Sequence, residues 1–141
     1  MFLLDTNVVS ELRKAKTGKA DKNVVEWASS AAASSMFISA ITIQELEIGI
    51  LLVERRAAAQ GVVLRRWLDT QVLPVFAERI LPVDTTVALR SAALHVPDPQ
   101  PIRDSLIAAT ALVHGMPVVT RNVSGFAATG VEIIDPWQAD G

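Results

Sequence analysis

The chain has 141 residues, half of them hydrophobic, and no cysteine. This composition favours a single well-filled domain and excludes disulfides, thiolate metal sites and cysteine nucleophiles. Thirteen basic against fifteen acidic residues give a formal charge of -2, which excludes binding of nucleic acid through an overall basic surface. Aromatic residues are few, and tyrosine is absent, which argues against a base-stacking platform. The apolar runs are too short to cross a membrane and Asp5 interrupts the first of them, so we expect a cytoplasmic protein without a membrane partner.

Short apolar runs alternate with helical patterns along the chain. Strands are predicted at 1–4, 36–39, 80–83, 118–120 and 131–134, and helices at 7–13, 23–34, 42–58, 62–72, 85–95 and 102–115. Gly61 is predicted to separate two antiparallel helices and Pro74 to end the second of them. The basic segment 14–19, the proline-rich segment 96–101 and the segment 121–130 are predicted loops, and the order of elements predicts an α/β fold, with helices on both faces of a parallel sheet and residues 1–141 in one domain.

Asp5 follows the first apolar run and therefore stands at the C-terminal end of a predicted buried strand. In open α/β sheets this edge is where ligands bind. Glu45 lies near the start of the helix 42–58, in a stripe predicted to face the core (Ile41, Glu45, Ile48 and Leu52). Asp104 lies in the first turn of the helix 102–115 and heads its apolar face. Acids in core-facing positions are uncommon unless they are paired or bound to metal.

Each of these acids also has a purely structural explanation. Asp5 could cap a helix, Asp104 could complement the dipole of its helix, and Glu45 could pair with an arginine. All three being structural is much less probable than one, so we expect a shared site. Asp84, which follows the third strand and precedes a helix, is predicted to be a capping residue, and Glu47 and Glu54 to be exposed.

Carboxylates gathered at one edge need a cation. Two of them at about 4 Å repel by roughly 4 kcal/mol if the effective dielectric constant is about 20. The only histidines, His95 and His114, are placed late in helices, which makes zinc an unsuitable ion. Oxygen ligands with open water positions favour Mg2+ or Mn2+, which can activate water against a phosphodiester. The residues therefore predict metal-assisted hydrolysis.

Four segments resemble, in order and spacing, the motifs of PIN-domain ribonucleases. They are LLDTNVVSEL at 3–12, ISAITIQEL at 38–46, IRDSLIAA at 102–109 and VTRNVSGF at 119–126. The closing segment GVEIIDPW at 130–137 resembles the VapC-type toxins of type II toxin-antitoxin systems, particularly the FitB-like branch. The resemblance covers essentially the whole chain.

The resemblance implies a three-layer α/β/α sandwich with about five parallel strands, and an endoribonuclease toxin that cleaves RNA with Mg2+ or Mn2+. It also implies inhibition by a cognate antitoxin and a homodimer. Asp5, Glu45 and Asp104 take the metal-binding acidic positions. Asn122 stands where many members carry a fourth acid, and Gly125 where the FitB-like branch often has one, so one tightly held ion is expected.

Several polar residues beside these acids have an expected role. Thr6, Asn7, Ser39, Thr120 and Asn122 are expected to orient the carboxylates or metal-bound waters, although caps and turn residues would look the same in the sequence. The arginines next to site positions, Arg103 and Arg121, are expected to contact phosphate, with solvated surface arginines as the alternative.

Three other functions compete with the nuclease. A response-regulator-like signalling module needs paired acids at the first strand and a lysine after the fifth. Asp84 could imitate its phosphoacceptor, but Asp5 has no adjacent acid and no lysine follows Lys22. An aspartyl phosphatase would need a second acid where Asn7 stands. A catalytically weak PIN relative that only binds RNA or antitoxin is favoured by the missing fourth acid.

Overall fold

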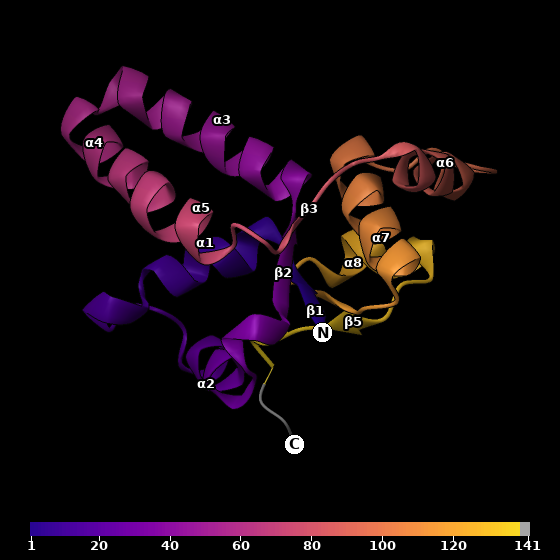
Figure 1. Ribbon diagram of the computed structural model, residues 1–141, viewed down its shortest axis with the longest axis horizontal. Helices are drawn as coiled ribbons and strands as arrows, with labels where there is room; N and C mark the ends of the chain where they lie inside the picture. Colours follow the sequence, from indigo (N-terminus) through magenta and orange to yellow (C-terminus); the bar gives the residue numbers. More distant parts are fainter. Residues whose placement is uncertain (139–141) are drawn as a thin grey trace.

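The structure, a computed structural model, describes residues 1–138 (Figure 1). These residues form one parallel sheet of five short strands in the order β3-β2-β1-β4-β5. The strands are β1 (Phe2–Leu4), β2 (Met36–Ser39), β3 (Ile80–Leu81), β4 (Val118–Val119) and β5 (Ile133–Ile134). Strand β1 is central, and Leu3 pairs with Phe37 of β2 on one side and with Val118 of β4 on the other. The C-terminal ends of β1, β2 and β4 therefore lie side by side.

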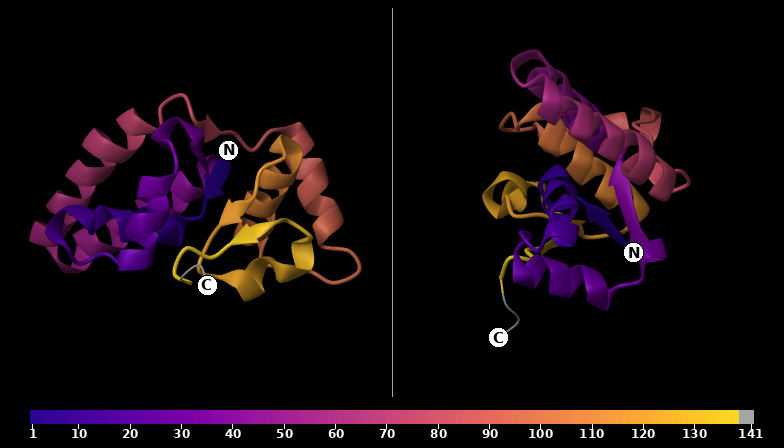
Figure 2. Two further views of the ribbon diagram at one scale, coloured as in Figure 1. Left: turned by 90° about the horizontal axis from the view of Figure 1, so that it is seen from below. Right: turned by 90° about the vertical axis from the view of Figure 1, so that its left-hand side faces the viewer.

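Helices cover both faces of the sheet, and three layers are visible in Figures 1 and 2. The helices are α1 (Thr6–Arg13), α2 (Lys22–Ser30), α3 (Ala40–Arg56), α4 (Ala58–Trp67), α5 (Leu73–Val75), α6 (Thr85–Leu94), α7 (Ile102–His114) and α8 (Val123–Phe126). One core cluster joins the sheet to α1, α3 and the segment 68–72, and a second joins it to α7 and α8. The predicted α/β/α sandwich is confirmed, and within residues 1–138 no helix has the length and apolar composition needed to cross a membrane.

The prediction at Gly61 was wrong, and the helix predicted to end at Pro74 continues one residue further, to Val75. Gly61 lies inside α4, where a Cβ atom would come 2.6 Å from Cγ of Glu54 on α3. The glycine therefore permits close packing of two helices instead of ending one. The chain stays helical past Trp67 through a π-helical segment (Leu68–Val72) and α5, which includes Pro74 near its start. The break between α3 and α4 falls at Ala57 instead.

The core-facing stripe of α3 was also predicted wrongly. Its buried residues are Thr42, Leu46, Ile50 and Val53, whereas Ile48 and Leu52 are exposed. Glu45 is only partly buried and lies beside this stripe, toward α7. Glu47 and Glu54 are not simply exposed, because Arg65 of α4 donates to both: its Nη1 and Nη2 atoms each lie 2.6 Å from Glu47, and Nη2 lies 3.1 Å from Glu54.

Three smaller differences concern element bounds. The predicted helix 23–34 is shorter, because α2 ends at Ser30 and a 3-10 turn (Ala33–Ser35) follows. The strands at β3, β4 and β5 are two residues long. The predicted loop 121–130 contains α8 and a 3-10 turn (Ala127–Thr129), which place Phe126 in the core.

Candidate active site

Asp5 ends β1 and caps α1. Its backbone is extended, and its side chain accepts a hydrogen bond from the backbone N–H of Thr6 at 2.8 Å. The other carboxylate oxygen accepts from Oγ1 of Thr120 at 2.8 Å and from Nδ2 of Asn7 at 3.3 Å. Asp5 is 5% exposed. Three donors, one from the residue after β4 and two from α1, therefore hold this carboxylate in one orientation.

Glu45 approaches the same place from α3, which begins directly after β2. Ser39, the last residue of β2, caps this helix by accepting from the backbone N–H of Ile41 at 3.0 Å. The Oε1 atom of Glu45 accepts a hydrogen bond from Oγ1 of Thr6 at 2.6 Å, and the hydroxyl of Thr42 lies 3.2 Å from that of Thr6. Thr6 thus donates to Asp5 through its backbone and to Glu45 through its side chain, which makes it the link between the two acids.

Asp104 completes the group from the first turn of α7. Its carboxylate lies 3.5 Å from Nδ2 of Asn122, and the neighbouring Arg103 places Nη1 at 3.9 Å from Oε2 of Glu45. A groove of about 870 Å³ opens beside these two acids, between the starts of α3 and α7, and Gln44 and Ile48 also line it. The structure therefore brings the three predicted acids to the C-terminal edge of the sheet.

Burial and the neighbouring negative charges raise the pKa values of two acids of the site, Asp5 and Asp104. Burial raises the pKa of Asp5, hydrogen bonds from Thr120 and Thr6 oppose that rise, and the charges of Asp104 and Glu45 add to it. Burial likewise raises the pKa of Asp104, the charge of Glu45 adds to the rise, and Arg103 opposes it. The site therefore holds excess negative charge that a cation would relieve.

The oxygen atoms of this site suit a cation that keeps part of its water shell better than one that has lost it. Among residues 1–138, no three histidine, aspartate or glutamate side chains are grouped closely enough to form a ready-made ion cage. Mg2+ is commonly bound through one or two carboxylates and keeps several waters, so it needs no such cage. Carboxylate oxygens with hydroxyl and amide groups beside them are the ligands and outer partners that such an ion accepts.

Of the other residues predicted for the site, four contact the acids, whereas Ser39 and the side chain of Arg121 have other partners. Thr6, Asn7, Thr120 and Asn122 contact one or more of the acids, as expected for orienting groups. Ser39 does not, since its hydroxyl caps α3. The exposed Arg121 stacks on a tryptophan, with Cζ at 5.2 Å from the ring centre of Trp137.

Sequence reasoning missed Thr42 and Trp137. Thr42 is fully buried, and its position three residues before Glu45, one turn away on α3, is the signal that could have identified it. Nothing in the local sequence pairs Trp137 with Arg121, because Arg121 follows β4 and Trp137 follows β5, with α8 between them in the chain.

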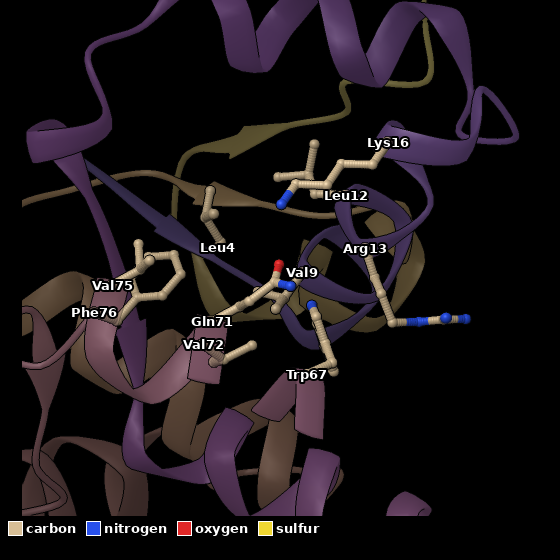
Figure 3. A pocket seen from close by; sticks show the side chains of 10 residues that line it. All are labelled: Leu4, Val9, Leu12, Arg13, Lys16, Trp67, Gln71, Val72, Val75 and Phe76. Carbon is tan, nitrogen blue, oxygen red and sulfur yellow. The ribbon is translucent and has the colours of Figure 1, made fainter. Parts of the chain in front are cut away.

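A second, apolar groove lies away from the acids (Figure 3). It runs between α1 and the helical segment that continues from α4 into α5, and has a volume of about 170 Å³. Leu12, Trp67, Val72, Val75 and Phe76 are among its lining residues, and the cations Arg13 and Lys16 line it from the side of α1. This groove is apolar with a basic border.

Comparison with known proteins shows the family of this chain. The model of the PIN domain family matches residues 2–131. The chain is 36% identical to VapC ribonuclease Y4jK of Sinorhizobium fredii, over 98% of this chain and 99% of the relative, and 37% identical to Toxin FitB of Neisseria gonorrhoeae, over 97% and 99%. A crystal structure of FitAcB from Neisseria gonorrhoeae superposes with a TM-score of 0.88 at 35% identity, covering 99% of this chain and 100% of that chain. The chain belongs to the PIN-domain family and is a member of its VapC and FitB toxin type.

Proposed function

We propose that this chain is a metal-dependent endoribonuclease, the toxin of a toxin-antitoxin pair, which hydrolyses RNA phosphodiesters at Asp5, Glu45 and Asp104. The observation that carries the proposal is the meeting of these acids at one sheet edge, with Thr6 bonded to two of them. The names of the relatives, VapC ribonuclease and Toxin FitB, support the same activity.

The proposed cofactor is Mg2+ or Mn2+, held by the three acids directly or through its bound waters. Such an ion, when bound, activates a water and stabilises negative charge on a phosphate under attack. The chain's own residues prepare the site for it. Asp5 accepts hydrogen bonds from Thr120, Asn7 and Thr6, so only some of its oxygen lone pairs remain free for the ion. The hydroxyl of Thr6 also keeps Glu45 facing Asp5. Because no fourth acid stands at Asn122 or Gly125, a single ion is the proposed occupancy.

Two arginines are proposed to contact the RNA backbone. Arg103 is about half exposed and lies beside Glu45. Arg121 follows Thr120, and its backbone N–H donates to Oδ1 of Asn7 at 3.3 Å. Arg103 belongs to α7 and Arg121 is two residues past the end of β4, so both come from segments that carry site residues. A chain with a net charge of -2 can then hold RNA through local cations and a bound ion.

A protein partner is also proposed. Solved relatives include the structure titled FitAB bound to IR36 DNA fragment, with a TM-score of 0.88 and 34% identity. We infer that a cognate antitoxin binds this chain and blocks the nuclease. The apolar groove of Figure 3 offers room for an apolar segment of such a partner. The exposed apolar residues of α3 and α4 offer a surface for a second copy of the chain, and they are Leu51, Leu52, Val62 and Val63.

The test is titration of Mg2+ or Mn2+ followed by an RNA cleavage assay on the same samples. The wild type should bind the ion and cleave, and Asp104→Asn should do neither. Asp69→Asn is the matched control, because Asp69 is an exposed acid on the segment that follows α4. Equal cleavage by Asp104→Asn and the wild type would contradict the proposal, and metal binding without cleavage in the wild type would favour the catalytically weak relative.

The signalling alternative loses its main support in the structure. Asp84, the only candidate phosphoacceptor, is exposed and caps α6 by accepting from the backbone N–H of Val87 at 2.9 Å. It follows β3, the strand at one edge of the sheet. Its predicted role as a capping residue is confirmed.

A further inference from the structure

A network of hydrogen bonds joins the end of α6 to the first turn of α7. His95, which follows α6, places Nε2 at 3.0 Å from Oγ of Ser105 on α7. The backbone N–H of Gln100, in the proline-rich segment, donates to Nδ1 of the same ring at 3.1 Å. The hydroxyl of Ser91 on α6 lies 3.2 Å from that of Ser105. Two helices and the segment that connects them therefore meet at one imidazole. Figure 1 shows α6 on the outer side of α7.

The direction of each hydrogen bond follows from the backbone donor. Because the N–H of Gln100 can only donate, Nδ1 of His95 must accept, and the neutral ring then carries its proton on Nε2. That proton is donated to Oγ of Ser105, and the Ser105 hydroxyl donates in turn to the carbonyl oxygen of Ile102 at 2.7 Å. Ser105 is fully buried, so removing His95 takes away a hydrogen-bond donor that water cannot readily replace.

The turn joined in this way is the one that carries Asp104. The three acids of the site are not held equally. Asp5 accepts hydrogen bonds from three donors, and Glu45 accepts a short one from Thr6 at 2.6 Å. Within residues 1–138, the carboxylate of Asp104 accepts one, from Asn122 at 3.5 Å, which is long for a hydrogen bond. Its side chain is therefore weakly held from the side of the site.

The start of α7 lacks the usual support as well. Its N-cap position is Pro101, whose side chain makes no capping hydrogen bond in the described part of the chain. Helices commonly begin with a serine, threonine, aspartate or asparagine that satisfies a free N–H group, and proline cannot do this. The position of the turn thus depends on the contact made behind it, through Ser105, which is the residue after Asp104.

We propose that His95 is a positioning residue of the nuclease site. Through Ser105 it holds the first turn of α7 against α6, and so keeps Asp104 beside Glu45 and Asp5. His95 itself lies in the α6–α7 contact, and its effect reaches the reaction through Ser105 and the backbone of the turn. This inference rests on the proposed function for its effect on cleavage, but its structural part can be measured without cleavage.

Two substitutions separate the two hydrogen bonds of the ring. The amide nitrogen of a glutamine side chain can reach the place of Nε2, so His95→Gln keeps the donor to Ser105 and loses the acceptor for Gln100. The side-chain oxygen of asparagine can reach the place of Nδ1, so His95→Asn keeps the acceptor for Gln100 and loses the donor to Ser105. Both are uncharged amides of similar polarity, which makes them a matched pair.

The first measurement is RNA cleavage together with Mg2+ affinity. We expect His95→Asn and His95→Ala to lower kcat or Mg2+ affinity about 10- to 100-fold, the loss typical of residues that orient a metal ligand. His95→Gln should stay near the wild type, because the contact with Ser105 remains. Equal behaviour of the glutamine and asparagine variants, whether both active or both impaired, would overturn the proposal.

The second measurement is amide hydrogen exchange without metal. The N–H of Ser105 donates to the carbonyl of Pro101 at 2.9 Å and reports the first turn of α7. It should exchange faster in His95→Asn than in His95→Gln, while the N–H of Asp5, bonded to Val119 at 2.9 Å, should be unchanged and serve as the control. No difference at Ser105 would overturn the positioning role. A wild type that binds no Mg2+ and cuts no RNA would instead overturn the proposed function, so the two failures are distinguishable.

Discussion

Asp5 and Asp84 have similar local sequence contexts, but Asp5 is buried in the folded protein and Asp84 is exposed. Each follows a short apolar run and begins a helix as its N-cap. Asp5 ends the central strand, is buried, and receives donors from α1 and from Thr120 beyond β4. Asp84 follows the edge strand β3 and is exposed. A central strand has neighbours on both sides whose following residues converge on its end, whereas an edge strand has one. The place of the strand in the sheet, more than the residues around the acid, separates a site residue from a cap.

The largest difference between the two acids should be seen in catalysis. Asp5→Asn is expected to abolish metal-dependent RNA cleavage, because an amide cannot supply the charge that a divalent ion needs. Asp84→Asn should leave the rate unchanged, since asparagine caps helices as well as aspartate does. The measurement is the initial rate of cleavage at saturating Mg2+. Comparable losses in both variants would show that the comparison between them is wrong.

Loss of the hydrogen bond from Thr120 to Asp5 should have the next largest effect, which is on metal affinity. Thr120→Val removes the hydroxyl that donates to Asp5 and keeps the shape of the side chain. Loss of a group that orients a ligand typically lowers metal affinity about 10- to 100-fold. Calorimetric titration of Mg2+ measures this change. Thr85→Val, beside Asp84 at the start of α6, is the control and should bind the ion like the wild type.

A smaller effect is expected on folding stability at the edge strand. Asp84→Ala removes the hydrogen bond to the N–H of Val87 and should lower the free energy of unfolding by about 1 kcal/mol, the usual value of an N-cap. Cleavage by the folded variant should be unchanged. Urea denaturation of Asp84→Ala and Asp84→Asn decides the point, because only the alanine variant should be less stable than the wild type.

The smallest effect should be the pH dependence of stability without metal. The pKa of Asp5 is raised in the folded protein, so the folded state binds its proton more tightly than the unfolded state does. Its contribution to stability is then greatest below the unfolded value of about 3.9, and is lost as the pH rises through the higher folded value. Asp5→Asn should therefore be at least as stable as the wild type at neutral pH.

Chemical denaturation at acidic and at neutral pH, in the presence of a chelator, measures this dependence. The advantage of Asp5→Asn over the wild type should grow from acidic to neutral pH. A wild type more stable than Asp5→Asn at neutral pH would mean that the hydrogen bonds of Thr120 and Thr6 outweigh the cost of burying the charge.

Much of the candidate site could be predicted, because its residues stand at element ends that local patterns reveal. Asp5 follows an apolar run, and Asp104 stands one turn before the buried pair Ile107 and Ala108. Glu45 was found for a partly wrong reason, since Ile48 and Leu52 do not face the core. In a helix with apolar residues on several faces, the sequence does not determine which face turns to the core. In α3, the contacts with α4 and the sheet determine it.

Other features depend on contacts between distant residues. Gly61 reads as a helix breaker, but the close approach of Glu54 from α3 makes it a packing residue. The role of His95 is not visible in the proline-rich sequence, because its partners Ser91, Gln100 and Ser105 are brought to it by the packing of α6 on α7.

The alternation of strands and helices, the parallel sheet and the identity of the three acids follow from the chain alone, since hydrophobic periodicity and capping act over a few residues. Folding in three dimensions settled the order of the strands, the link through Thr6 and the hydrogen bonds behind Asp104. Those features arise from pairing between segments as far apart as Asp5 and Thr120, and no local pattern specifies which distant groups meet.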